Sequence, residues 1–151
     1  MQERFKEFTV LITRLNRCIH KIKTEEMAEF NLKSPHVSCL YYLFKMQPLT
    51  ANELCGICAE DKASISRSIE HLEKEGYLIC ASGAKKRYNA PFTLTDKGEN
   101  TGRMIADKID AVLEGSSFGV SDQDRQIMYK SLGVILDNLQ KYCMKYEEKG
   151  E

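Results

Sequence analysis

The stretch Leu49–Thr95 constrains the fold of this chain more than any other part. It opens with Thr50 and Glu53, whose spacing predicts a capping box at the start of a short helix. Asp61 is placed to cap a second helix, which ends at Gly76. Two short apolar segments follow, joined by a basic loop, and they predict a pair of antiparallel strands. This order is that of a helix-turn-helix followed by a β-hairpin wing.

The second helix of this motif has two different faces. Ile65, Ile69 and Leu72 fall within about 60° of one another on a wheel of 100° per residue, and they predict its buried side. The opposite side carries small and polar residues with one arginine. Such a surface suits close approach to base edges, because bulky apolar groups would block a DNA groove. We therefore expect DNA contacts from Lys62, Ser64, Ser66 and Arg67.

The loop between the two predicted strands carries three adjacent cations, Lys85, Lys86 and Arg87. The whole chain has 22 basic and 22 acidic residues, so its net charge does not indicate a nucleic-acid partner. Residues 62–88, however, hold six basic and three acidic residues, a local balance of 6 − 3 = +3. Local charge matters because phosphate attraction is screened beyond about 8–10 Å. We expect these cations to contact the DNA backbone or a flanking minor groove.

The segments around this motif predict further helices. Ser34 followed by Pro35 predicts an N-cap and a first helical position, and Gln47–Pro48 ends that helix. Pro91 predicts that the return strand lies at the edge of its sheet. Thr95 caps the next helix, for which we expect a buried side formed by Met104, Ile105, Ile109 and Val112 or Leu113.

The two ends of the chain carry long apolar seams. From Phe5, apolar residues recur at spacings of 3, 4, 3, 4 and 3 as far as Ile22, in a helix that fades near Asn31. A last helix, which begins near Ser121, has a second seam at spacings of 4, 3, 4, 3 and 4, formed by Met128, Leu132, Ile135, Leu139, Tyr142 and Tyr146. Two such seams are hard to bury in so small a chain, which favours a homodimer.

The pattern resembles the MarR family of winged helix-turn-helix transcriptional regulators. The resemblance is carried by Leu49-Thr50, Glu53-Leu54, Ile65-Ser66-Arg67, the run Leu72–Leu78 and the run Leu94–Gly98. It implies a mainly α (α+β) fold with flanking N- and C-terminal dimerisation helices. On this basis we expect a winged helix-turn-helix domain at 32–97 and a helical dimerisation region at 1–31 and 98–147.

The resemblance also implies a function. Such a protein represses transcription as a dimer bound to a pseudo-palindromic operator in double-stranded DNA, and a small-molecule effector modulates it. An effector cleft between the helical region and the winged domain would place Cys18, His36, Tyr41 and Tyr42 near the ligand. One feature departs from the family pattern: the wing commonly carries an Asp-x-Arg motif, whereas Lys85-Lys86-Arg87-Tyr88 has no acidic residue.

The sequence is also compatible with two other kinds of protein, a thiol-redox regulator and a protein-binding module. The six cysteines, in a chain without a secretion signal, are interpreted as reduced thiols of a cytoplasmic protein. A thiol-redox regulator would use Cys18 or Cys55, and a winged-helix module could instead bind another protein. Cys55-x-x-Cys58 lacks the second ligand pair of a zinc site. We expect no metal, no cofactor, no enzymatic activity and no membrane span.

Overall fold

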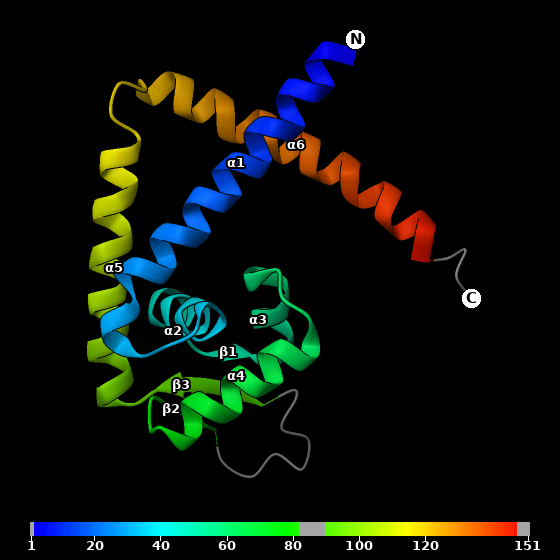
Figure 1. The fold of residues 1–151 in the computed structure, drawn as a ribbon. Helices are drawn as coiled ribbons and strands as arrows, with labels where there is room; N and C mark the ends of the chain where they lie inside the picture. The colour runs from blue at the N-terminus through cyan, green and yellow to red at the C-terminus, as the bar shows by residue number, and fades with distance from the viewer. Residues whose placement is uncertain (1, 82–89, 148–151) are drawn as a thin grey trace. The chain divides into compact units, whose positions relative to one another are not determined.

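The computed structural model describes residues 2–81 and 90–147, without the side chains of residues 2–5 and 147. The chain divides into two compact units, Met1–Ala111 and Val112–Glu151. Among the described residues there are six α-helices, one 3₁₀ helix and three short strands, a mainly helical architecture as predicted (Figure 1). Their order is α1 (Gln2–Glu26), η1 (Ala28–Phe30), α2 (Ser34–Met46), β1 (Leu49–Thr50), α3 (Ala51–Cys58), α4 (Lys62–Lys74), β2 (Leu78–Cys80), β3 (Pro91–Leu94), α5 (Asp96–Ser116) and α6 (Asp122–Glu147).

The winged helix-turn-helix lies within the first unit. Helices α2, α3 and α4 pack on one another, and the strands form an antiparallel sheet in the order β1-β3-β2. The predicted inner side of α4 is buried, with Ile65 and Leu72 fully enclosed. Apolar residues of α2, α3, the sheet and α5 complete this core, namely Val37, Leu40, Leu43, Leu54, Leu78, Phe92 and Ile105.

The predicted helix caps of the motif are present. The Glu53 amide donates to Thr50 Oγ1 at 3.2 Å, and the Thr50 amide donates to a Glu53 carboxylate oxygen at 2.8 Å. The Ser64 amide donates to the Asp61 carboxylate at 2.7 Å, which caps α4. Gly76 follows the end of α4 with φ +74°, the left-handed conformation that glycine adopts without strain. These local signals fix where both helices of the motif begin and where α4 ends.

Two predictions on local structure are wrong. The N-cap of α2 is Lys33, with extended dihedrals, and the helix already begins at Ser34. The strand containing Pro91 is central, because the short β1, which we did not predict, pairs with it through Leu49 and Phe92. Proline is tolerated there because it is the first residue of β3, where its missing N–H costs little, while its carbonyl still accepts the Ala81 amide at 2.9 Å.

The buried side of α5 matches the expected one only in part: Ile105 is buried and Ile109 packs partly buried against the core, but other expected residues do not. Met104 and Leu113 are about half exposed, at 50% and 54%. The rest of the buried side, beside Ile105, is formed by the small residues Gly98, Gly102 and Ala106. A Cβ at Gly102 would lie 2.9 Å from Cβ of Phe44, so glycine allows α5 to approach α2 closely. Periodicity of large apolar residues missed this face because the close contacts are made by small ones.

The long helices α1 and α6 keep most of their apolar residues at the surface. On α1, Leu11, Leu15 and Ile19 are 49–61% exposed. No described residue of α6 is buried, and its seam includes Ile135 at 37% and Tyr146 at 70% exposure. The cap predicted for α6 is present, since the Asp124 amide donates to Ser121 Oγ at 3.1 Å. The predicted seams therefore form regular helices that carry exposed apolar side chains.

Candidate nucleic-acid interface

The outward face of α4 presents the predicted contact residues to solvent. Lys62, Ser66 and Arg67 are exposed, and Ser64 is half-buried beside the capping carboxylate of Asp61. Arg67 has no hydrogen-bond or ion-pair partner among residues 2–81 and 90–147. Its guanidinium is therefore available to a ligand, and its planar fork of donors matches the paired acceptors of a guanine edge or a phosphate.

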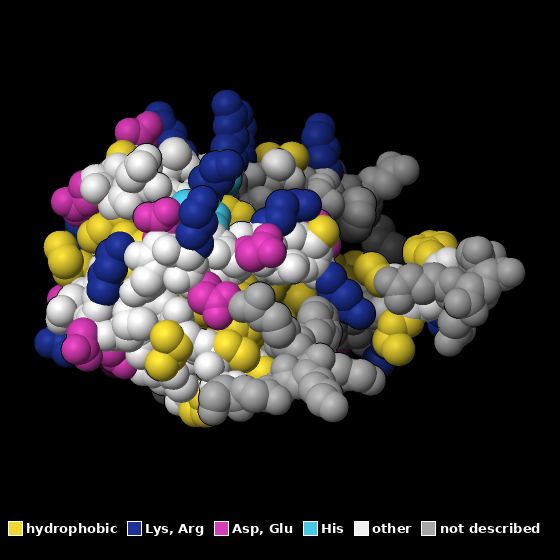
Figure 2. Space-filling model, turned by 90° about the horizontal axis from the view of Figure 1, so that it is seen from below, with side chains coloured by type: hydrophobic (Ala, Val, Ile, Leu, Met, Phe, Trp, Pro, Cys, Tyr) yellow, Lys and Arg dark blue, Asp and Glu magenta, His cyan; other side chains and the backbone are white. Residues whose placement is uncertain are grey.

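Charge on this face is mixed. Within residues 62–81, three basic residues (Lys62, Arg67, Lys74) balance three acidic ones (Glu70, Glu73, Glu75), so the net charge there is 3 − 3 = 0. Figure 2 shows Lys and Arg side chains intermixed with Asp and Glu over the face seen from below. The local excess of +3 comes entirely from Lys85, Lys86 and Arg87. Those three residues lie outside the described part of the chain.

The stem of the wing is well defined up to that loop. In the β2–β3 pair, Leu78 faces Leu94 and Cys80 faces Phe92. One more backbone hydrogen bond, from the Ala81 amide to the Pro91 carbonyl, extends the pairing by one step. This hairpin follows α4 directly. Its paired strands therefore place Ala81 and Ala90, the two residues that flank residues 82–89.

A network that we call the α4–α5 clasp joins the end of α4 to the start of α5. Thr95 Oγ1 donates to the Gly76 carbonyl at 2.7 Å and accepts the Gly98 amide at 3.1 Å. Lys97 Nζ donates to the Glu75 carbonyl at 2.6 Å and lies 4.0 Å from the centroid of the Tyr77 ring. The clasp explains the Leu72–Leu78 and Leu94–Gly98 motifs: they hold α4 against the sheet and α5.

The four candidate effector residues occupy different surroundings. Cys18 is exposed on α1. His36 is buried in α2, and its ring stacks on that of His71 of α4, with centroids 4.3 Å apart. Burial, followed by the proximity of His71 and Lys33, lowers the pKa of His36. The stack ties α2 to the last turn of α4, a contact that residue spacing along the chain does not reveal.

Tyr41 and Tyr42 are half-buried neighbours on α2, with rings edge to face at 5.1 Å between centroids. Burial, with smaller effects from Cys58 and Tyr41, raises the pKa of Tyr42.

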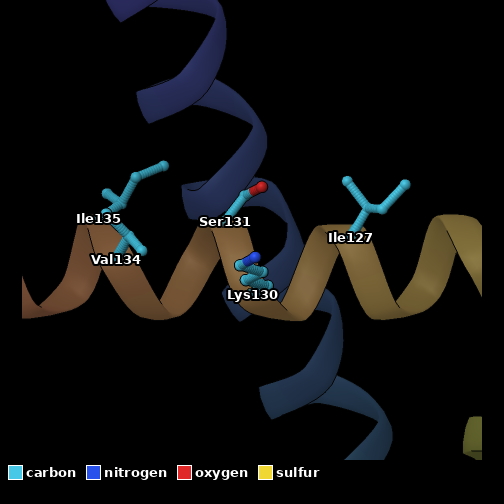
Figure 3. Close-up of a pocket in the computed structure, with 5 residues that line it drawn as sticks. All are labelled: Ile127, Lys130, Ser131, Val134 and Ile135. Carbon is cyan, nitrogen blue, oxygen red and sulfur yellow. The ribbon is translucent and has the colours of Figure 1, made fainter.

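A separate shallow groove runs along α6, lined by Ile127, Lys130, Ser131, Val134 and Ile135. Figure 3 shows Ile127, Ser131 and Ile135 on one side of the helix, one turn apart. Its lining comes from a single helix, so it is an open apolar surface.

Sequence reasoning missed a thiol pair. Side-chain interaction with Cys58 of α3, followed by burial, raises the pKa of the Cys39 thiol of α2. Spacing along the chain pairs Cys58 with Cys55 instead, because only the packing of α2 on α3 brings Cys39 to Cys58. None of the described cysteines forms a disulfide.

Neither a metal cluster nor a membrane span is present among the described residues. Residues 2–81 and 90–147 contain no group of three or more His, Cys, Asp or Glu side chains placed to hold a metal ion. The same part of the chain contains no helix that is both long enough and apolar enough to span a bilayer.

No family model matches the sequence. Among curated proteins, an uncharacterized HTH-type transcriptional regulator of Bacillus cereus is 24% identical over 119 residues, which cover 77% of this chain and 78% of that protein. Helix-turn-helix regulators are thus the curated proteins to which this sequence is similar.

Solved structures with the same fold include MarR-family proteins. A Listeria monocytogenes MarR-family regulator complexed with a 26mer DNA has a TM-score of 0.76 and 22% identity, with 85% of each chain covered. A Staphylococcus aureus MarR in complex with salicylate and kanamycin has a TM-score of 0.77 and 17% identity, covering 90% of this chain and 92% of that one. These likenesses confirm the resemblance predicted from the motifs: this chain has the winged-helix fold of MarR-family regulators.

Proposed function

We propose that this protein is a DNA-binding transcriptional regulator, most simply a cytoplasmic repressor, that binds a pseudo-palindromic operator as a homodimer. The observation that carries the proposal is the two-sided α4: Ile65 and Leu72 anchor it in the core, while Ser66 and Arg67 face solvent. The same fold in the Listeria monocytogenes regulator was solved with a 26mer DNA, which supports this use of the fold.

In the proposed complex, α4 enters the major groove with its N-terminal half. Arg67 and Ser66 contact base edges, whereas Lys62 and Ser64 contact the flanking phosphates. A bidentate arginine–guanine contact contributes about 1–3 kcal/mol of discrimination. The wing residues Lys85, Lys86 and Arg87 take the adjacent minor groove or backbone. Since residues 62–81 are electrically balanced, most of the salt dependence of binding should come from these three wing cations.

The proposed homodimer is supported by the exposed seams of α1 and α6. Large apolar surfaces of this extent mark protein contacts in folded proteins. We propose that residues 1–31 and 98–147 form the dimerisation region and that residues 32–97 form the DNA-binding domain. A two-fold axis between two copies would then set two α4 helices on half-sites about one helical turn apart, roughly 34–36 Å.

We further propose modulation by a small-molecule effector, with Cys18, His36, Tyr41 and Tyr42 as candidate contacts. Support comes from the Staphylococcus aureus MarR of the same fold, which was solved with salicylate and kanamycin. Tyr41 and Tyr42 present half-buried aromatic rings that suit an aromatic ligand. Thermal unfolding with and without salicylate measures this: we expect a higher midpoint in the wild type and a smaller shift in Tyr41→Ala.

The decisive experiment is selection of bound sequences from random duplexes, followed by affinity measurements. We expect a two-fold symmetric site, and we expect Arg67→Ala to weaken specific binding by roughly tenfold to a hundredfold, the equivalent of about 1–3 kcal/mol. The matched control is Arg103→Ala, which removes an exposed arginine from α5. Equal losses in the two variants would exclude Arg67 from base recognition, and no enrichment of any sequence would exclude the proposed function.

The wing has its own test. Replacing Lys85, Lys86 and Arg87 together by alanine should flatten the plot of log affinity against log salt by about 0.9 for each phosphate that the wing no longer neutralises. If the slope is unchanged, the wing does not contact phosphate.

A further inference from the structure

We propose that the stacked rings of His36 and His71 form a proton-operated link between α2 and α4: the neutral pair holds α4 in place, and a proton on His36 releases it and lowers DNA affinity. The two rings lie nearly parallel, at 14°, with centroids 4.3 Å apart. They come from two helices that pack on each other. The effect on DNA rests on the proposed function, whereas the link within the protein does not.

A hydrogen bond fixes the protonation state of His36 on which the link depends. The Lys33 amide donates to Nδ1 of His36 at 3.3 Å, so this nitrogen is an acceptor and the neutral ring carries its proton on Nε2. His36 is the third residue of α2 and is only 9% exposed. A proton on Nδ1 sets two donors against each other in a buried place. The ring then has to turn, and turning it breaks its stack on His71.

The surroundings of His36 favour its neutral form. Burial has the largest effect on its pKa, and His71 and Lys33 lower it further. The positive end of the α2 dipole lies at His36 as well, and it disfavours a cation there. His36 therefore takes a proton only below the ordinary histidine pKa of about 6.5.

The elements that pack on this end of α2 bring mostly basic groups. From α1, Lys23 reaches α2 at Ser38, two residues beyond His36, where its Nζ donates to the serine hydroxyl. On α4, the charged side chains at helical spacing from His71 are those of Arg67, Lys74 and Glu75. Only Glu75 among them is acidic, and its side chain is exposed. A proton on His36 thus adds a cation to a site whose neighbours are already cationic.

The end of α4 is held from two sides. The α4–α5 clasp ties it to α5 through the Gly76 and Glu75 carbonyls, and the histidine stack ties it to α2. His71 lies four residues after Arg67, so the two side chains stand on the same side of α4, about one turn apart. Loss of the stack leaves the clasp to hold this end against α5 alone. The helix can then turn, and the Arg67 side chain moves relative to the duplex.

The direction of the pH effect follows from these protonation states. Above about pH 6.5, His36 is neutral, the stack is intact and DNA affinity is at its maximum. As the pH falls through the lowered pKa of His36, the pair opens and affinity falls. One linked proton changes affinity by at most about tenfold for each pH unit below that pKa. A histidine that contacted phosphate directly would act the other way, because its proton adds a positive charge.

The first test needs no DNA. The chain has three histidines, so NMR of the full chain can follow each ring. At high pH the His36 ring should carry its proton on Nε2. On acidification, the backbone amides in the last turn of α4 should shift with the titration midpoint of His36 and not with that of His20, an exposed histidine of α1. A proton on Nδ1 of the neutral ring, or α4 amides that do not follow His36, overturns the link.

The second test measures affinity for the selected duplex at constant salt, over the pH range in which the helical circular dichroism is unchanged. Wild-type affinity should fall by roughly threefold to tenfold for each pH unit below the His36 midpoint. His36→Asn keeps an acceptor for the Lys33 amide but takes no proton, so its affinity should not fall. His20→Asn, the matched control, should follow the wild type. Equal falls in the wild type and His36→Asn, or a rise on acidification in the wild type alone, overturns the proposal.

A second variant keeps the proposal testable if His36→Asn does not fold. His71→Phe keeps a flat ring against His36 and removes a group that lowers the pKa of His36. Both the NMR midpoint of His36 and the fall in affinity should therefore move to higher pH, and an unchanged midpoint overturns the link. Absence of binding at high pH refutes the proposed function alone, since the NMR titration still decides whether α2 and α4 are coupled.

Discussion

Helices α4 and α6 both carry regular apolar stripes, but the stripe of α4 is buried and the stripe of α6 is exposed. On α4, Ile65 and Leu72 are fully buried and Ile69 is 7% exposed. On α6, Leu139 and Tyr142 remain 49% and 60% exposed. The stripe of α4 meets α2, α3 and the sheet inside its own unit. The comparison teaches that periodicity predicts a helix and its apolar face, but it does not say which molecule covers that face.

The largest expected effect is on the α6 seam. Ile135→Lys combined with Leu139→Lys places two unpaired ammonium groups in the proposed dimer interface, where each costs several kcal/mol to desolvate. Light scattering at micromolar concentration should report a dimer for the wild type and a particle near 17.3 kDa for the variant. Gln126→Lys combined with Gln140→Lys, on the other side of α6, should remain dimeric. A monomeric wild type would contradict the proposal that a second copy of the chain covers the α6 seam.

The next effect contrasts a packed glycine with an open one. A Cβ at Gly98 would lie 1.9 Å from the Tyr77 carbonyl oxygen in the α4–α5 clasp, whereas a Cβ at Gly133 of α6 meets nothing within 4 Å. Gly98→Ala should lower the free energy of unfolding by about 1–3 kcal/mol, because the backbone has to shift. Gly133→Ala should raise it by up to about 1 kcal/mol through helix propensity.

Urea unfolding at one protomer concentration measures both glycine variants, since the stability of a dimer depends on concentration. A loss at Gly133 comparable to that at Gly98 would mean that another chain packs closely on that point of α6. That outcome would sharpen the comparison by locating the contact.

The smallest effect concerns pH and the His36–His71 stack. Burial, then His71 and Lys33, lowers the pKa of His36 in the folded state. Below its unfolded value of about 6.5, the unfolded chain binds a proton that the folded chain resists, so stability is complete above that pH and falls as the pH drops towards the lowered pKa. The unfolding midpoint should decline less between pH 7.5 and 5.5 in His36→Gln than in the wild type. His20→Gln, an exposed control on α1, should behave like the wild type.

Much of the winged fold could be predicted because its signals are local. The Thr50–Glu53 box, the Asp61 cap and the turn at Gly76 each depend on residues within a few positions of one another, and all three are present. The inner face of α4 followed from residue spacing alone. The roles of Ser66, Arg67 and the wing cations in DNA binding stay predictions, and the wing cations lie outside the described residues.

Other features depend on which elements meet, and spacing does not report that. Pro91 is compatible with an edge strand or with the first residue of a central one, and only the pairing with β1 decides between them. Small residues form much of the buried face of α5. Gly98 and Gly102 are buried because the Tyr77 backbone and the Phe44 side chain approach them closely, so a search for large apolar residues does not find them.

The sequence by itself therefore determined the helices, their caps and the two-sided character of α4, since backbone hydrogen bonding and side-chain periodicity act over a few residues. Only the tertiary structure decided which residues far apart in the chain became neighbours. It brought Cys39 to Cys58 and His36 to His71, and it left the stripe of α6 exposed. The physical reason is that burial is a property of packed surfaces, and a stripe on one helix is the same whether its own chain or another one covers it.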